Sequence, residues 1–200
     1  MSTRLLVSQE DDILLLTLDS EDGFPRLERS VLAALGQKIA ELESSRELDG
    51  AVITGTGRAF AAGAEIAELA TLTPVEAHEF ARSGQQIFAR IEQSQKPVIA
   101  AIRGYCMGGG LDLALACRQR IATPDAMFAH PGGAIGLLTG WGGTQRLPRL
   151  IGRARGMEML TTGRLVEAGE ALDWGLVMEI VPADKLIAEA IRLAAYRSDL

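Results

Sequence analysis

The sequence predicts a mixed α/β fold in which glycine-rich turns separate strands from helices. Short apolar runs of strand length alternate with segments of helical period, which is the pattern of an α/β architecture. Glycines gather where strands lead into helices, notably at Gly55, Gly63 and Gly108–Gly110. No linker, internal repeat or low-complexity segment divides the 200 residues, so we expect one domain over residues 1–200.

Buried strands and amphipathic helices account for the first half of the chain. The strands expected from apolar runs are residues 13–18, 50–54 and 98–102. A first helix is expected over residues 27–42, where apolar residues recur with helical spacing. A second begins at Thr73-Pro74, because Thr73 can cap it and Pro74 suits the first helical position, and ends near Gln93.

The second half is expected to continue this alternation. An apolar helix opens in Met107–Asp112 and reaches about Cys117, and a glycine-rich loop covers residues 131–143. The other expected elements are strands at 121–123, 127–129 and 177–181, helices at 153–162 and 167–174, and a terminal amphipathic helix at about 183–198. The core of the domain is then about residues 5–182.

Composition excludes several classes of function. The net charge of -6 with no basic cluster offers no electrostatic footprint for nucleic acid. Cys106 and Cys117 lie in apolar stretches without metal-ligand or disulfide spacing, so we expect two buried thiols and no metal site. The N-terminus has no signal-peptide pattern and no run approaches the length of a membrane span, which predicts a cytoplasmic protein.

Two glycine-bearing turns, one ending near Ala64 and the other at Gly108–Gly110, predict an oxyanion hole. Glycine lets a ligand approach backbone amides closely, and a helix N-terminus favours negative charge. Amides at Ala64 and Gly109 would together hold an oxygen that becomes negative during a reaction. Taken singly, the turns also suit a tight strand–helix junction or a small-residue crossing. A phosphate-binding loop is disfavoured because the GxxxxGK[ST] pattern is missing.

Three segments carry a resemblance to a known family: Ala59–Ile66, Lys96–Gly110 and Gly142–Gly152. Together with 160–164 and 168–181 they resemble the crotonase, or enoyl-CoA hydratase/isomerase, superfamily over nearly the whole chain. The resemblance implies a spiral of ββα repeats, a coenzyme A thioester as substrate and no tightly bound cofactor. It also implies a homo-oligomer, trimer or hexamer, and an oxyanion hole formed by the Ala64 and Gly109 amides.

The carboxylates of the family's hydratases are altered here. Hydratases of the superfamily resemble one another in two glutamates that position a water and shuttle its proton. The corresponding residues are Asp112, shorter by one methylene, and Gly132, which has no side chain. Asp112 is either a catalytic carboxylate or a first-turn residue that stabilises its helix. His130 is either an acid or base in the pocket or a structural residue, and Trp141 either walls the pocket or packs in the core.

The remaining candidate substrate-binding residues surround the two turns. Where the family often has Asn-Ala-Leu, this chain has Pro25-Arg26-Leu27, and Arg26 could meet a phosphate. The set expected to face the substrate is Arg26, Leu27, Ala62, Glu65, Ile66, Met107 and Gly108, with His130, Gly132 and Trp141.

The leading hypothesis is therefore an enzyme of the enoyl-CoA hydratase/isomerase type that stabilises a thioester enolate on an acyl-CoA or an acyl-carrier thioester. The missing second carboxylate leaves two alternatives open: an atypical crotonase, such as a decarboxylase or another lyase, and a non-catalytic acyl-CoA-binding or assembly subunit. Members of the superfamily usually continue into further C-terminal helices. Ending at Leu200, the chain is expected to have this helical part shortened, with a more open pocket or one completed by a longer partner subunit.

Overall fold

The computed structural model describes residues 2–196. Its strands are β1 (Arg4–Glu10), β2 (Ile13–Asp19), β3 (Gly50–Gly55), β4 (Ala59–Ala61), β5 (Val98–Ile102), β6 (Tyr105–Met107), β7 (Gln119–Ala122), β8 (Met127–Ala129), β9 (Val166–Glu167) and β10 (Glu179–Ile180). Its helices are α1 (Arg29–Ser44), α2 (Ile66–Leu69), α3 (Pro74–Gln93), α4 (Gly109–Ala116), the 3-10 helix η1 (Pro131–Ile135), α5 (Gly143–Ile151), α6 (Arg153–Thr162), α7 (Ala168–Asp173) and α8 (Leu186–Ala195).

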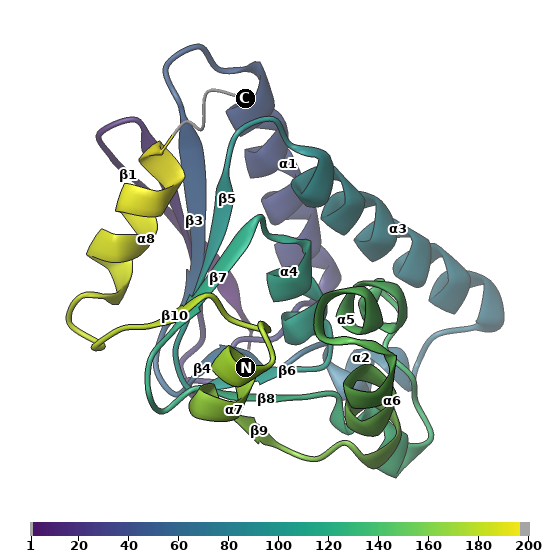
Figure 1. Cartoon of the computed structure of the whole chain (residues 1–200). Helices are drawn as coiled ribbons and strands as arrows, with labels where there is room; N and C mark the ends of the chain where they lie inside the picture. The colour runs from purple at the N-terminus through teal and green to yellow at the C-terminus, as the bar shows by residue number, and fades with distance from the viewer. Residues whose placement is uncertain (1, 197–200) are drawn as a thin grey trace.

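The strands form two sheets. The larger has six strands in the order β1-β2-β3-β5-β7-β10, parallel except for the antiparallel pair β1–β2. The smaller has the order β4-β6-β8-β9, with β9 antiparallel to β8. Figure 1 shows the smaller sheet running across the lower end of the larger one, with α1, α3 and α4 on one side of the larger sheet and α8 on the other.

Helices cover both faces of the large sheet because its central strands are apolar on both faces. Successive side chains of a strand point to opposite faces. Along β5, Val98, Ala100 and Ile102 belong to the main core under α1, α3 and α4. Ile99 and Ala101 instead join a smaller core under α8. The run expected at 98–102 is therefore a fully buried strand, and its bounds are confirmed.

The chain winds as a spiral of repeated ββα units. In each turn, one strand enters the large sheet, the next enters the small sheet, and a helix follows: β3-β4-α2, β5-β6-α4 and β7-β8-η1. Because the parallel order is kept in both sheets, the turns that follow β4, β6 and β8 stack at one edge of the small sheet. The predicted α/β spiral is confirmed, and it brings together loops that are far apart in the sequence.

Several expected boundaries were wrong. The helix expected from residue 27 begins at Arg29, and the strand expected at 177–181 is reduced to β10. α8 ends at Ala195; residues 197 and 198 of the expected terminal helix lie outside the described residues. β1 and α5 were not expected at all, nor were the short elements β4, β6, β9 and α2.

The cysteines and the lengths of the helices were also predicted from the sequence. Cys106 and Cys117 are buried free thiols, as predicted, and burial raises the pKa of Cys117 to about 12. Over residues 2–196, no helix combines the length and the apolar character needed to cross a membrane.

Candidate functional site

The two glycine-bearing turns lie against each other beside the N-terminus of α4. The first follows β4 and carries Gly63 and Ala64; the second joins β6 to α4 and carries Gly108 and Gly109. A Cβ added to Gly63 would lie 3.2 Å from the Gly109 nitrogen, and one added to Gly109 would lie 3.5 Å from the Ala64 nitrogen. Gly63 and Gly108 have φ angles of 98° and 51°, which glycine adopts without strain. The absence of side chains therefore permits this close approach.

Backbone hydrogen bonds fix both turns but leave the Ala64 and Gly109 amides unused within residues 2–196. The Ala62 N–H donates to the Pro25 carbonyl at 2.8 Å, and the Gly108 N–H donates to the carbonyl at the end of β8 at 2.9 Å. Within residues 2–196, neither Ala64 nor Gly109 donates its N–H to another backbone group. The Gly109 amide is also one of the free donors at the start of α4, where the helix dipole is positive. Two neighbouring donors are thus available to a ligand oxygen.

These amides border an apolar cavity of about 700 Å³, the size of a small-ligand pocket. Its walls come from the two turns, from α2 and α3, and from the segment between β8 and α5. Of the sequence-predicted residues, the ones that line it are Ala62, Ala64, Ile66, Gly108, Gly109, His130, Gly132 and Trp141. His130 is the one ionisable residue among its described lining residues.

Trp141 fills both of the roles considered for it. Its side chain is only 4% exposed and makes edge-on contacts with Phe80 and Phe88 of α3, at ring-centroid distances of 5.3 and 5.6 Å. The ring also lies so close to Gly109 that a Cβ there would collide with it. Trp141 is consequently a core residue that also forms the cavity wall beside the second free amide.

Asp112 is fully buried behind that wall. One turn into α4, its side chain has no exposed surface and does not line the cavity. Oδ2 accepts a short hydrogen bond from the Thr139 hydroxyl and another from the Trp141 N–H at 3.0 Å. Oδ1 has no hydrogen-bond partner among the described residues. The carboxylate is therefore placed to act on its neighbours rather than directly on a ligand in the cavity.

Thr139 is the residue of this cluster that sequence reasoning missed. It lines the cavity and donates to Asp112, so it connects the buried carboxylate with the pocket. The signal was present, because Thr139 is the single hydroxyl in the otherwise apolar and glycine-rich segment 131–143.

His130 faces the free oxygen of Asp112. Its Nε2 lies 3.7 Å from Asp112 Oδ1, beyond normal hydrogen-bond length. Both ring nitrogens are buried and neither has a hydrogen-bond partner within residues 2–196. Buried polar atoms without partners are rare, since each costs about 1–3 kcal/mol. Three such atoms on two neighbouring residues mark this corner of the cavity as a polar site whose hydrogen-bonding groups lack partners among the described residues.

Gly132 leaves no room for the missing carboxylate. A Cβ at this position would lie 2.6 Å from the Leu137 carbonyl oxygen, and the Leu137 N–H donates to the Gly132 carbonyl at 2.9 Å. The backbone that follows the 3-10 helix η1 therefore occupies the space that a side chain at residue 132 would need. A glutamate at residue 132 would therefore require the backbone around Leu137 to move.

Four other sequence-predicted residues do not line the cavity: Arg26, Leu27 and Glu65 support the first turn, and Met107 precedes the second. Arg26 pairs with Asp22 at 2.8 Å and with Glu65 at 3.1 Å. Glu65 also caps α2, and the Leu27 amide donates to the Gly63 carbonyl at 2.8 Å. Met107 is half-buried in β6, on the strand that leads into the second turn.

The Asp112–His130 pair predicts an unusual pH dependence of stability. Burial raises the pKa of Asp112 from 3.8 to about 6, although the Thr139 hydroxyl, the Trp141 and Gly143 backbone amides and the charge of Arg146 all act to lower it. Burial also lowers the pKa of His130 from 6.5 to about 4. As the pH falls from 6 to 4, the folded protein gains stability from Asp112, which binds its proton more tightly when folded. Over the same range it loses stability from His130, which binds its proton more tightly when unfolded.

Each contribution is worth about 3 kcal/mol, so the two nearly cancel in the native chain. Asp112→Asn removes the stability gained from Asp112, so on acidification this variant should lose stability relative to the native chain. His130→Gln removes the stability lost through His130, so on acidification this variant should gain stability relative to the native chain. Urea unfolding at pH 7 and pH 4.5 measures the change in the free energy of unfolding for each protein. The contributions of the other carboxylates cancel in the comparison, because all three proteins share them. Parallel pH dependence in the three proteins would contradict the pKa directions.

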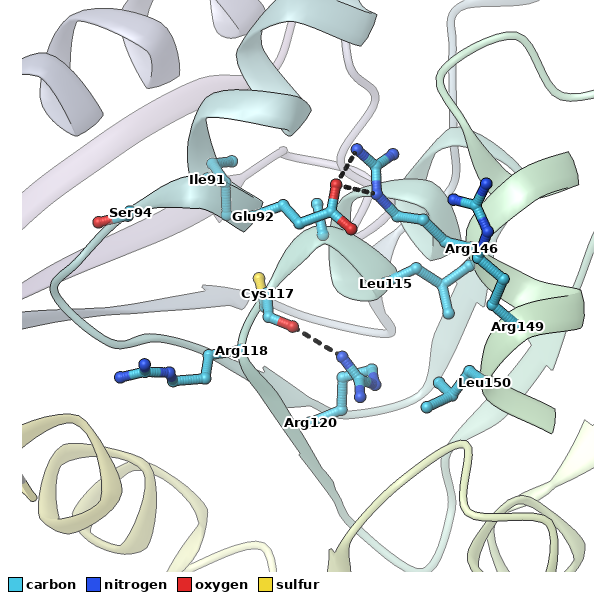
Figure 2. A pocket seen from close by; sticks show the side chains of 11 residues that line it. Ile91, Glu92, Ser94, Leu115, Cys117, Arg118, Arg120, Arg146, Arg149 and Leu150 are labelled. Carbon is cyan, nitrogen blue, oxygen red and sulfur yellow. Dashed lines mark hydrogen bonds and ion pairs between the residues drawn. The ribbon is translucent and has the colours of Figure 1, made fainter. Parts of the chain in front are cut away.

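A second, smaller cavity of about 350 Å³ lies on another part of the surface, between the C-terminal ends of α3, α4 and α5 (Figure 2). Arg120 donates to the Cys117 carbonyl at 2.7 Å and to the Leu176 carbonyl at 2.9 Å. Arg146 pairs with Glu92 at 2.8 Å and donates to the Trp141 carbonyl at 3.0 Å. Arg120 neutralises the C-terminus of α4, and Arg146 is held by its ion pair and its backbone contact, so we interpret both arginines as structural. Arg146 thereby holds the segment that carries Trp141.

Comparison with known proteins agrees with the geometry. Residues 8–197 match the family model described as enoyl-CoA hydratase/isomerase. A crotonyl-CoA hydratase of Syntrophomonas wolfei is 35% identical over 191 residues, which cover 95% of this chain and 74% of the relative. A fatty acid oxidation complex subunit alpha of Shewanella loihica is 43% identical over 162 residues, 79% of this chain but 23% of that much longer protein.

Solved structures show the same likeness in three dimensions. The crystal structure of an enoyl-CoA hydratase from Bacillus anthracis superposes with a TM-score of 0.89 at 33% identity, and the match covers 95% of this chain and 74% of that one. The DspI structure from Pseudomonas aeruginosa gives a TM-score of 0.90 at 36% identity, over 96% and 78% of the two chains. The match spans both sheets and both glycine-bearing turns, and the chain belongs to the enoyl-CoA hydratase/isomerase family of the crotonase superfamily.

Proposed function

We propose that this protein binds a coenzyme A thioester and adds water to its 2-enoyl group. The observation that carries the proposal is the pair of unused amides, Ala64 and Gly109, at the edge of an apolar cavity. A thioester carbonyl oxygen gains negative charge when an enolate forms, and two backbone donors aimed at one point stabilise that charge. The match of the chain to named hydratases supports this reaction over the alternatives.

The shape and lining of the cavity suit the acyl part of such a substrate. With the carbonyl oxygen on the two amides, the acyl chain would extend over the apolar side chains of α2, α3 and the segment after η1. Few polar groups line this space, so the acyl group is held by burial of apolar surface. We expect short or medium unsubstituted acyl chains to be preferred over acyl chains that carry a charge.

Hydration joins a water oxygen to the β carbon of the enoyl group. As that bond forms, the double-bond electrons move onto the thioester oxygen and give an enolate, and a proton of the water must be removed. The enolate then takes a proton at the α carbon. Ala64 and Gly109 lower the energy of the enolate, and a separate group must move the proton.

Crotonyl-CoA hydration, followed as the loss of absorbance of the conjugated thioester, tests the proposal. A turnover number on the order of 1 s⁻¹ or more is expected, the lower end of the usual range for enzymes. Calorimetry with acetoacetyl-CoA should be run on the same preparation to measure thioester binding independently. Failure to bind any acyl-CoA would reject the thioester site itself.

The binding measurement also separates the enzyme from a non-catalytic acyl-CoA-binding subunit. The observation that favours such a subunit is Gly132, whose surroundings exclude the usual carboxylate. Binding without turnover over a panel of 2-enoyl-CoA thioesters would support the subunit. Turnover of a β-carboxylated or β-keto thioester without hydration would instead support an atypical lyase.

A further inference from the structure

We propose that His130 moves the proton in this site and that Asp112 positions its imidazole. The proposal rests on the proposed function, because it assigns a proton-transfer group to the same thioester cavity. Its basis is the geometry at the wall between the cavity and α4, where a histidine borders the cavity and a carboxylate lies directly behind it.

His130 is the ionisable side chain that the cavity offers. Asp112 has no exposed surface and is not part of the lining, and Gly132 can hold no carboxylate. Among the described lining residues, only His130 has an ionisable side chain, and a neutral imidazole can accept a proton and later return it. The lining hydroxyl, Thr139, already donates its hydrogen to Asp112.

The unpartnered atoms distinguish this histidine from a structural one. A core histidine normally satisfies both ring nitrogens, whereas neither nitrogen of His130 has a hydrogen-bond partner in the part of the chain that the structure describes. Its Nε2 lies 3.7 Å from Asp112 Oδ1, which also lacks one. Catalytic hydrogen bonds are often long before a ligand binds and shorten in the complex. Once shortened, this contact would let Asp112 hold one nitrogen as N–H and leave the other free to take a proton.

Burial keeps the imidazole neutral at neutral pH, so it is in the form that can accept a proton. Burial lowers the pKa of His130, and burial raises that of Asp112. Of the other charged or titratable groups near the pair, Arg146 of α5 lowers the pKa of Asp112. The buried thiol of Cys106 in β6 has a raised pKa and stays uncharged. Thr139 and the Trp141 amide fix the far oxygen of the carboxylate, so its free oxygen stays turned toward His130.

The reaction balances with these groups alone. Neutral His130 accepts a proton from water as the water oxygen bonds to the β carbon, and the double-bond electrons pass to the thioester oxygen on Ala64 and Gly109. The imidazolium then returns the proton to the α carbon as the enolate collapses. In the reverse half-reaction, His130 would remove an α proton from a saturated thioester such as butyryl-CoA, exchange it with solvent and return it.

The first test compares the native chain with His130→Gln, which keeps a polar side chain of similar size. The control is His78→Gln, because His78 is the other histidine of the chain and is exposed on α3. We expect His130→Gln to lower kcat for crotonyl-CoA hydration about 100-fold or more. The dissociation constant for acetoacetyl-CoA should change little, the acidic limb of the pH–rate profile should disappear, and His78→Gln should match the native chain. A native kcat in His130→Gln would overturn the proposal.

The second test concerns Asp112 as a positioning residue. If it acts only through the imidazole, Asp112→Asn lowers kcat, and the double variant Asp112→Asn/His130→Gln is no slower than His130→Gln alone. Additive losses would show that Asp112 supports the fold or the cavity independently of His130, and would overturn its assigned role.

Deuterium exchange at the α carbon of butyryl-CoA keeps the two proposals distinguishable. Exchange needs the oxyanion hole and a base but not hydration. If the native chain exchanges the α proton but does not hydrate crotonyl-CoA, and His130→Gln loses the exchange, His130 is supported as the proton-transfer group and hydration is rejected as the reaction. If His130→Gln still hydrates crotonyl-CoA, hydration is supported and the role of His130 is rejected. Bound thioester with neither hydration nor exchange in the native chain would reject both.

Discussion

Replacing Ala64 with proline is expected to lower kcat for the thioester reaction about 100- to 1000-fold, the usual effect of losing one oxyanion-hole donor. Proline has no N–H, so the change removes one of the two unused amides without adding a charge. The Gly109 amide stays in place at the start of α4. Steady-state kinetics with crotonyl-CoA measures the effect, which should appear in kcat more than in KM because the enolate is stabilised more than the substrate.

Ala64→Gly is the matched control. It changes the same residue but keeps the amide N–H, and it is expected to retain activity within about 10-fold of the native chain. Circular dichroism and acetoacetyl-CoA binding establish that the proline variant is folded. Equal losses in the proline and glycine variants would mean that the shape of the turn matters and that the amide does not.

The second large effect is expected from Trp141→Ala. Removing a buried Trp costs about 3–5 kcal/mol, because the cavity left behind is only partly filled. The ring contacts Phe80 and Phe88 and covers Gly109, so its loss should lower the Tm by ~10 °C and enlarge the acyl cavity beside the hole. We therefore expect the ratio of kcat/KM for longer or branched 2-enoyl thioesters over crotonyl-CoA to rise.

Trp174→Ala is the control, because Trp174 is the other tryptophan and lies under Arg155 and Arg164, outside the residues that line the cavity. It is half-buried, so a smaller loss of stability is expected, and its acyl preference should be that of the native chain. The same shift of acyl preference in both variants would show that Trp141 does not wall the acyl site.

The sequence predicts those elements whose stability is local in origin. β5 and α6 have the expected bounds, and α3 begins at the expected Thr73–Pro74 cap, where Thr73 and Glu76 form a capping box. In each case the apolar period or the capping residues specify the element without reference to the rest of the chain.

The elements that were missed depend on tertiary contacts. β1 lacks an apolar alternation and is mostly exposed, and it is a strand because it pairs with β2 along its whole length. α5 contains Pro148 and begins at Gly143, features typical of a loop. Leu147 and Ile151 are buried against the core and hold it as a helix. Helix propensity alone does not predict this packing.

The same distinction holds within the site. The glycine pattern predicts the two turns, since close backbone approach requires glycine wherever it occurs. Whether Asp112 would reach the cavity depended on the path of the segment between η1 and α5, which places Thr139 and Trp141 over it. The closure of η1 over Gly132 and the contact between His130 and Asp112 follow from that path too. Sequence spacing could not distinguish a carboxylate in the pocket from one behind its wall.

The claim that Ala64 and Gly109 polarise a thioester carbonyl can be measured directly by isotope-edited infrared spectroscopy of crotonyl-CoA labelled with ¹³C at that carbonyl. Hydrogen bonds to the oxygen weaken the C=O bond, so the carbonyl band of the bound thioester should move to lower frequency than in water. The shift should persist in Ala64→Gly and shrink in Ala64→Pro. A bound carbonyl with the frequency found in water, in a protein that still turns the thioester over, would contradict the oxyanion hole.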